Sequence, residues 1–255
     1  MQVFASYARY YDLLYRDKDY AAEAQYVHEL LQNHAPDTTS LLELGCGSGI
    51  HAALLAQQGY QVYGVDLSAD MLEQADSRLS SLPTEVASRL EFSQGDIRTI
   101  RLDKQFDAVI SLFHVMSYQT SNEDLQSAFT TIKSHLKPGG VLIFDCWYGP
   151  AVLSDRPQVR VKRLEDEEIA VTRIAEPVMH PNDNLVNVNY QVFIRNRASG
   201  VVEELQEAHK MRYLFKPEVD KLFLENEIEL TAFGKWMSDS EAGFNSWNVY
   251  FVGRG

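Results

Sequence analysis

Between residues 40 and 150, short apolar runs alternate with longer segments whose apolar residues recur at helical spacing. Strands joined through helices in this way must run parallel, because a parallel connection needs a long crossover, and the helices then cover both faces of the sheet. The sequence therefore predicts an α/β fold with a doubly wound, mostly parallel sheet. The expected strands in this region are 40–44, 61–65, 90–93, 106–113 and 141–146.

After Pro150 the pattern changes to alternation with a period of two, broken by turn residues at 182–184 and 198–200. That pattern is typical of antiparallel hairpins. A helix at 217–226 and strands at 228–233 and 247–252 then return to the first pattern. We expect 1–150 and 216–255 to form one domain with an N-terminal helical cap, and 151–215 to form an antiparallel lid inserted in it.

A glycine-rich loop, ELGCGSG at 43–49, joins the first expected strand to the next helix. Glycine at alternate positions allows a sharp turn and a close approach of the backbone to a ligand. Residues 47–52 also fit the G-x-G-x-x-A pattern of dinucleotide-binding loops. The loop alone therefore leaves three interpretations open, which are a structural turn, a dinucleotide site and another nucleoside site.

Three carboxylates lie at the C-terminal ends of three successive expected strands: Glu43, Asp66 and Asp96. The carboxyl ends of parallel strands meet along one crevice, where Asp66 can accept hydrogen bonds from both hydroxyls of a ribose. A pyrophosphate next to Glu43 would be repelled, whereas a ligand that carries an ammonium and a sulfonium would be attracted. This arrangement disfavours an NAD-dependent oxidoreductase, which remains the alternative from a different class.

Acidic residues outnumber basic ones by 36 to 23, giving a formal charge of −13. That sign disfavours nucleic acid and anionic membranes as partners. The two cysteines, Cys46 and Cys146, are too few for a disulfide framework, and no signal peptide or membrane span is evident. We expect a cytoplasmic enzyme, monomeric or homodimeric, that acts on a small molecule.

As a set, the motifs from residue 40 to 146 resemble the class I S-adenosylmethionine (SAM)-dependent methyltransferases. The matching motifs, in the family's order, are E-x-G-x-G-x-G at 43–49, G-x-D-x-S at 64–68, GDI at 95–97, FDAVIS at 106–111 and LKPGG at 136–140. The resemblance implies a seven-stranded sheet of Rossmann-like type whose last strand is antiparallel, and SAM as the cofactor.

The resemblance also implies cofactor contacts for individual residues. The methionine moiety would lie on the loop, the ribose on Asp66, the adenine between apolar side chains and Asp96, and the methyl group near the residues after the fourth strand. The full set of expected cofactor residues is Glu43, Gly45, Cys46, Gly47, Gly49, Asp66, Leu67, Met71, Asp96, Ile97, Ser111, Leu112 and Phe113.

A narrower resemblance is to the aminosugar N,N-dimethyltransferases of macrolide biosynthesis. It rests on YYDLLY at 10–15, KDYAAE at 18–23, Ser111 to Phe113 with Tyr118, WYGP at 147–150, and His209 ahead of Leu214 and Phe215. One departure concerns the arginine that meets the nucleotide-sugar phosphates in that group just before the last strand. Here that stretch, 243–248, contains no arginine, and Arg160, Arg163 or Arg212 are the candidate substitutes.

The acceptor site is expected from aromatic and polar side chains on separate segments. Methyl transfer is an in-line displacement, so alignment supplies much of the rate, and an amine needs only its lone pair. Tyr11, Tyr118 and His209 are the expected catalytic residues, with Trp147 as a further aromatic wall and His114 as a rival base. No histidine and carboxylate spacing indicates a metal.

The sequence thus predicts a SAM-dependent methyltransferase that acts on a small molecule, with the amine of an aminosugar or nucleotide-linked aminosugar as the first candidate. An O-methyltransferase, a simple-amine N-methyltransferase and a SAM-binding protein without catalysis are the alternatives.

Overall fold

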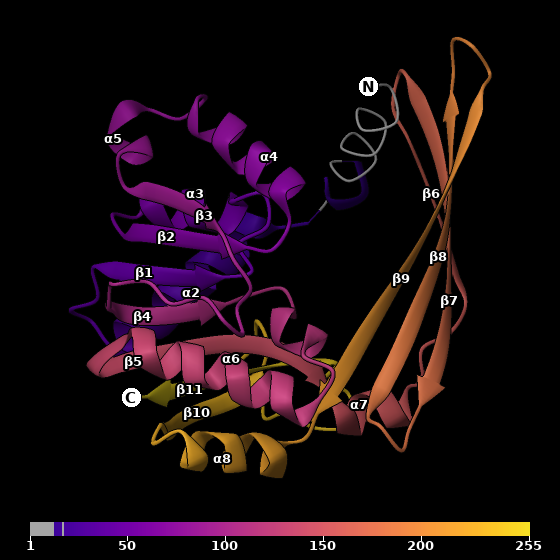
Figure 1. Ribbon diagram of the computed structural model, residues 1–255. Coiled ribbons are helices and arrows are strands. Elements are labelled where there is room, and N and C mark those ends of the chain that lie inside the picture. The colour runs from indigo at the N-terminus through magenta and orange to yellow at the C-terminus, as the bar shows by residue number, and fades with distance from the viewer. Residues whose placement is uncertain (1–12, 17) are drawn as a thin grey trace. The chain divides into compact units, whose positions relative to one another are not determined.

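The computed structural model describes residues 13–16 and 18–255. The contacts within the chain divide it into two compact units (Figure 1). The larger unit contains Tyr20–Asp155 and Arg212–Gly255. The smaller contains Arg156–Met211 together with the described residues before Tyr20. The sequence had assigned that N-terminal segment to the larger domain, and the division into 1–150 with 216–255 and 151–215 stays a prediction.

The larger unit is built on a seven-stranded sheet in the order β3-β2-β1-β4-β5-β11-β10. Strands β1 to β5 run parallel to one another, and β11 is antiparallel to both β5 and β10. The predicted doubly wound sheet with an antiparallel last strand is thereby confirmed. The strands are β1 (Ser40–Leu44), β2 (Gln61–Asp66), β3 (Leu90–Gln94), β4 (Phe106–Ser111), β5 (Leu136–Tyr148), β10 (Glu229–Lys235) and β11 (Asn248–Arg254).

Helices cover both faces of this sheet because its central strands are apolar on both sides. Leu41 and Leu42 are adjacent in β1, so their side chains point to opposite faces, and both are fully buried. On one face the core contains side chains of α6 (Asn122–His135) and α8 (Lys216–Glu225). On the other it contains side chains of α2 (Tyr20–His34) and α3 (Ile50–Gln57).

Local signals set the helix boundaries. Ser68 caps α4 (Ala69–Leu79), where its hydroxyl accepts a hydrogen bond from the Met71 amide, and the helix ends three residues before the predicted Leu82. The predicted capping box of Ser121 and Asp124 is present at the start of α6. The short elements α5 (Thr84–Ala87), η1 (Val115–Tyr118) and α7 (Gly149–Ser154) were not predicted, because one turn of helix leaves no periodic pattern.

The smaller unit is an antiparallel sheet, as predicted for the insert. It consists of β6 (Arg160–Glu165), β7 (Ile169–His180), β8 (Leu185–Asn196) and most of β9 (Val202–Leu214). Leu13 and Leu14 join its apolar core with residues of β7 and β8. The last residues of β9, Tyr213 and Leu214, belong to the larger unit and pair in parallel with the end of β5.

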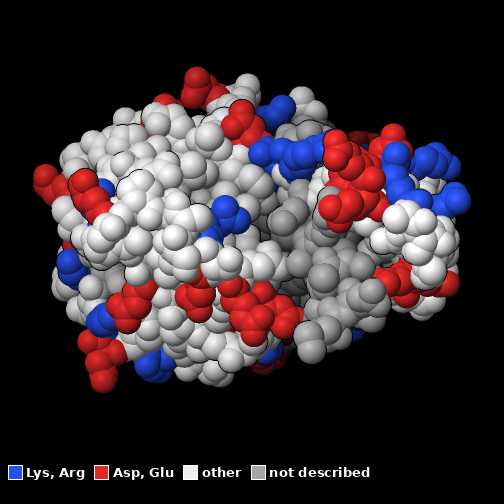
Figure 2. Space-filling view, turned by 90° about the horizontal axis from the view of Figure 1, so that it is seen from above, with Lys and Arg blue, Asp and Glu red and all other residues white. Residues whose placement is uncertain are grey.

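Among the described residues, no helix is long and apolar enough to span a membrane. On the face shown in Figure 2, acidic and basic side chains are interspersed and separated by uncharged surface.

Candidate functional site

The glycine loop turns sharply between β1 and α3, and its amides are held by the end of β2. The amides of Gly45 and Cys46 both donate to the Val65 carbonyl, at 2.7 and 3.0 Å. The three glycines have φ values of +80°, +54° and +71°, which side chains rarely tolerate.

The glycines serve two purposes. A Cβ on Gly45 would lie 2.5 Å from a methyl of Val115, and one on Gly49 would lie 2.7 Å from the ring of Phe92. These two positions therefore require glycine for packing. A Cβ on Gly47 would meet nothing within 4 Å, so this residue offers open space for the approach of a ligand.

Asp66, at the end of β2, connects the glycine loop to the start of α4. One carboxylate oxygen accepts from the Gly47 amide at 2.8 Å, and the other accepts from the Ser68 amide at 2.9 Å. Each oxygen has a second lone pair, so the carboxylate can still receive donors from a ligand. Its contact with a ribose stays a prediction.

Glu43 is a buried carboxyl group, 1% exposed, at the end of β1. Burial, together with the nearby carboxylate of Asp66, raises the pKa of Glu43 to about 8. Among the described residues, its Oε2 atom has no hydrogen-bond partner. A buried acceptor without a donor is costly, and a cationic ligand group would satisfy it.

Two further residues near Glu43, His51 and Glu23, were not singled out from the sequence. His51 of α3 lies with Nδ1 4.0 Å from Oε1 of Glu43, and its Nε2 is 2.8 Å from a carboxylate oxygen of Glu23. Glu23, Glu43 and His51 lie on three different elements, α2, β1 and α3, so no local pattern could have linked them.

Asp96, after β3, forms an ion pair with Arg98, a residue that the sequence analysis did not single out. The guanidinium of Arg98 makes a 2.5 Å ion pair with it and also contacts Asp124 at 2.8 Å. This guanidinium holds the pKa of Asp96 below its usual range. The short spacing of Asp96 and Arg98 was the available signal. An adenine amine would therefore meet a carboxylate that already has a cationic partner.

The apolar residues expected around the cofactor differ in exposure. Leu67 is 64% exposed and Met71 is partly buried, whereas Ile97 is 7% exposed. Ser111 and Leu112 are buried, and the Ser111 hydroxyl donates to the Leu44 carbonyl at 3.0 Å. These two side chains thus serve the core in this structure, and their cofactor contacts stay predictions.

The chain leaves β4 through two consecutive left-handed residues, Phe113 and His114, each with a φ of 63°. Nδ1 of His114 lies 2.6 Å from a carboxylate oxygen of Asp145, which is 1% exposed. Asp145 was not predicted as a site residue, because it lies inside an apolar strand 31 residues further along the chain.

The three expected catalytic residues are distributed over the chain. Tyr11 lies outside the described residues. Tyr118 is in η1 of the larger unit and is 46% exposed. His209 is in β9 of the smaller unit, with Nε2 3.2 Å from Glu207 and its ring 5.3 Å from that of Tyr190. Their assembly into one site stays a prediction.

Arg212 is not available as a substitute phosphate ligand, contrary to one of the options from the sequence. It is 6% exposed, and its guanidinium contacts Asn122 at 2.7 Å and forms an ion pair with Glu218. Arg160 and Arg163 are exposed on β6.

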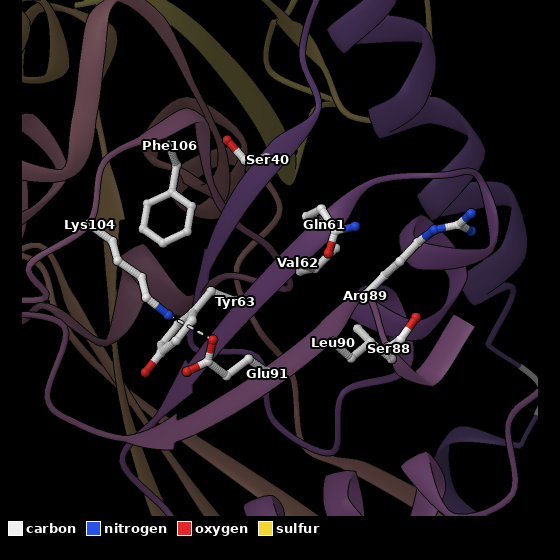
Figure 3. Close-up of a pocket in the computed structure, with 10 residues that line it drawn as sticks. All are labelled: Ser40, Gln61, Val62, Tyr63, Ser88, Arg89, Leu90, Glu91, Lys104 and Phe106. Atoms are coloured by element: carbon white, nitrogen blue, oxygen red, sulfur yellow. Dashed lines mark hydrogen bonds and ion pairs between the residues drawn. The ribbon is translucent and has the colours of Figure 1, made fainter. Parts of the chain in front are cut away.

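A cavity of about 330 Å³ lies at the other end of the parallel strands (Figure 3). Its lining includes the first residues of four strands, which are Ser40, Gln61, Leu90 and Phe106. Lys104, at its rim, pairs with Glu91 at 2.7 Å. The glycine loop follows the carboxyl end of β1, so this cavity is separate from the candidate site. Among the described residues, no cluster of three or more histidine, cysteine or acidic side chains could hold a metal.

Comparisons with known proteins place this geometry in context. A family model described as a methyltransferase domain matches residues 41–140. The dTDP-3-amino-3,4,6-trideoxy-α-D-glucopyranose N,N-dimethyltransferase of Streptomyces venezuelae is 33% identical over 188 residues, or 73% of this chain and 76% of that protein.

Solved structures share the fold over nearly the whole chain. A SAM-dependent methyltransferase from Clostridium acetobutylicum has a TM-score of 0.82 and 22% identity, covering 99% of this chain and 98% of its own. DesVI of S. venezuelae has a TM-score of 0.79 and 26% identity, covering 97% of both chains.

Proposed function

This chain belongs to the class I SAM-dependent methyltransferases, and from that premise we propose that it methylates the amine of an aminosugar, with a nucleotide-linked sugar as the first candidate. The acceptor class is supported by the 33% identity to a dTDP-aminosugar N,N-dimethyltransferase. We also propose that it works in the cytoplasm, as a monomer or homodimer.

The observation that most supports SAM as the cofactor is the buried Glu43 carboxyl, whose Oε2 atom has no hydrogen-bond partner among the described residues. The loop that follows it has open space at Gly47. SAM supplies an ammonium, an electrophilic sulfonium methyl group and no phosphate. The residues present fit such a ligand, because a positive charge beside Glu43 would favour its ionised form and provide the missing partner. A dinucleotide would instead bring a pyrophosphate to this buried acidic group.

Around the cofactor we propose roles for the neighbouring side chains. Asp66 would accept from the ribose hydroxyls while keeping its hold on the Gly47 amide. Leu67, exposed in the turn after β2, would lie against the adenine ring. The apolar surface buried in that contact would offset the entropy lost when the Leu67 side chain is ordered.

On the acceptor side, we propose that aromatic side chains position the amine. Trp147 and Trp247 lie edge to face, with ring centroids 5.5 Å apart, and the exposed Tyr118 follows β4 in the same unit. Aromatic faces tolerate both the sulfonium and the methylated ammonium product. Alignment of the nucleophile with the methyl carbon supplies about 7 kcal/mol or more of the barrier reduction.

The nucleotide part of the acceptor needs its own test, because the arginine expected before the last strand is missing and Arg212 is buried against Glu218. The experiment compares methyl transfer from labelled SAM to three compounds. They are dTDP-3-amino-3,4,6-trideoxy-α-D-glucopyranose, the same aminosugar without its nucleotide, and the dTDP-sugar with a hydroxyl in place of the amine.

Transfer to the first compound, with a kcat/KM at least about 10-fold above that of the free aminosugar and no transfer to the hydroxyl compound, supports the proposal in full. Equal rates with and without the nucleotide would limit the acceptor to the sugar itself. Preferential transfer to the hydroxyl compound would contradict N-methylation and favour the O-methyltransferase alternative.

A further inference from the structure

The strongest local distortion near the candidate site occurs where the chain leaves β4. Phe113 and His114 both have left-handed backbones, although neither is glycine. Such conformations are unfavourable for residues that carry a Cβ and persist only where surrounding contacts hold them. The contacts that hold this turn therefore indicate which side chain the fold keeps in place there.

Asp145 holds the backbone of this turn. Both of its carboxylate oxygens accept the backbone N–H of His114, at 3.1 and 3.2 Å. One of them also lies 2.6 Å from Nδ1 of the His114 ring, which is an ion-pair distance, and among the described residues Nδ1 has no hydrogen-bond partner. Asp145 is in the middle of the sheet, on β5, and is almost completely buried. The backbone of His114 is thus fixed by a rigid group whose negative charge also lies against the ring.

This pair lies next to the glycine loop. Val115, which directly follows His114, packs against Gly45 so closely that no Cβ would fit there. The ring centroid of His114 lies 5.4 Å from that of Phe113 and 6.4 Å from that of Trp147. The imidazole is therefore at the carboxyl end of β4, among aromatic side chains, and is itself 17% exposed.

We propose that His114, oriented by Asp145, accepts the proton that an ammonium acceptor must lose before methyl transfer. This inference rests on the proposed function, since it assumes an amine acceptor. The negative charge of a carboxylate 2.6 Å from Nδ1 favours the tautomer that carries its proton there, which leaves the lone pair of Nε2 available.

The need for such a group follows from the chemistry of amines. An alkyl amine such as that of lysine has a pKa of about 10.4, so at neutral pH its lone pair is occupied by a proton. Nε2 of His114 takes that proton from the R–NH₃⁺ group. The freed lone pair then forms the N–C bond as the S–C bond of SAM breaks, S-adenosylhomocysteine leaves, and His114 releases its proton to solvent. A second methylation repeats these steps, beginning with the loss of a proton from the monomethylated ammonium to His114.

The test compares wild-type enzyme with His114→Gln, Asp145→Asn and the control His34→Gln, which lies at the end of α2, ahead of the amino end of β1. Rates are measured with SAM and dTDP-3-amino-3,4,6-trideoxy-α-D-glucopyranose from low to high pH, with and without added imidazole. SAM affinity is measured separately by calorimetry.

We expect H114Q to lower kcat about 100-fold at neutral pH and only a few-fold at high pH, where the amine is already deprotonated in solution. Imidazole should restore part of the H114Q rate. It should not restore D145N, which still carries its own imidazole in a poorer orientation. SAM affinity should stay within about twofold in H114Q, and H34Q should behave as wild type.

An H114Q defect that is equal at all pH values and insensitive to imidazole would overturn the assignment, even with an active wild type. A wild type that methylates the hydroxyl compound but not the amine would overturn the acceptor proposal, and the ammonium role of His114 with it. D145N is the variant most prone to misfolding, and H114Q decides the question without it.

Discussion

At the scale of single residues, the proposed cofactor site depends most on the carboxylates at the carboxyl ends of the strands. Asp66 is predicted to hold the ribose with both oxygens while also accepting the Gly47 and Ser68 amides. Removing a charged bidentate contact by Asp66→Ala should weaken SAM binding by about 2–4 kcal/mol, as measured by calorimetry. Asp103→Ala, at an exposed position ahead of β4, is the matched control, and unchanged affinity in D66A would refute the ribose assignment.

Glu43 should make the free energy of unfolding depend on pH, and the direction of its pKa shift sets the sign. Its pKa is raised from 4.5 to about 8 in the folded protein, so between these values the folded state keeps a proton that the unfolded state has lost. The stability that the protonated Glu43 carboxyl contributes to the fold is fully present below pH 4.5 and is lost as the pH rises through about 8. The free energy of unfolding should therefore fall with rising pH by at most about 1.4 kcal/mol per pH unit from this group.

Urea unfolding at several pH values checks this, with Glu43→Gln as the comparison. The glutamine cannot ionise, so the variant should lose stability less steeply than the wild type between pH 5 and pH 8. If both proteins show the same slope, Glu43 is not the titrating group. Measurements are made without SAM, because a bound cation would favour the ionised carboxylate.

At the scale of elements, the sequence predicted structure well wherever a signal is local. The capping box at Ser121 and the alternation along β9, whose odd-numbered residues from Glu203 to His209 are less exposed than their neighbours, are both local patterns. By contrast, the pairing of His114 with Asp145, and that of His51 with Glu43 and Glu23, joins residues on different elements. Only the order and register of the strands bring those side chains together.

The capping box itself can be tested. The Ser121 hydroxyl accepts the Asp124 amide at 3.0 Å, so Ser121→Ala should lower the free energy of unfolding by about 1 kcal/mol. Ser127→Ala, in the interior of the same helix, should be neutral or slightly stabilising, because alanine is the better helix former. Equal stability of the two variants in urea would show that the cap contributes nothing.

At the scale of the whole molecule, the chain consists of a methyltransferase sheet and an antiparallel insert with its own apolar core. The sequence predicts that the insert closes over bound SAM as a lid, and that Tyr11, Tyr118 and His209 meet at the acceptor. If positioning dominates, Tyr11→Phe and His209→Ala should each lower kcat about 10- to 100-fold without abolishing turnover. SAM affinity should be retained in both variants. Complete loss of turnover in either variant, with both ligands bound, would instead indicate obligatory base catalysis by that residue.

The most direct test of the account is the position of the transferred methyl group. The enzyme is incubated with SAM labelled with ¹³C at the methyl carbon and with dTDP-3-amino-3,4,6-trideoxy-α-D-glucopyranose, and the product is examined by heteronuclear NMR. We expect the labelled methyl to correlate with the sugar carbon that bears the amine. A labelled methyl correlated with a carbon that bears oxygen, or no labelled sugar at all, would contradict it.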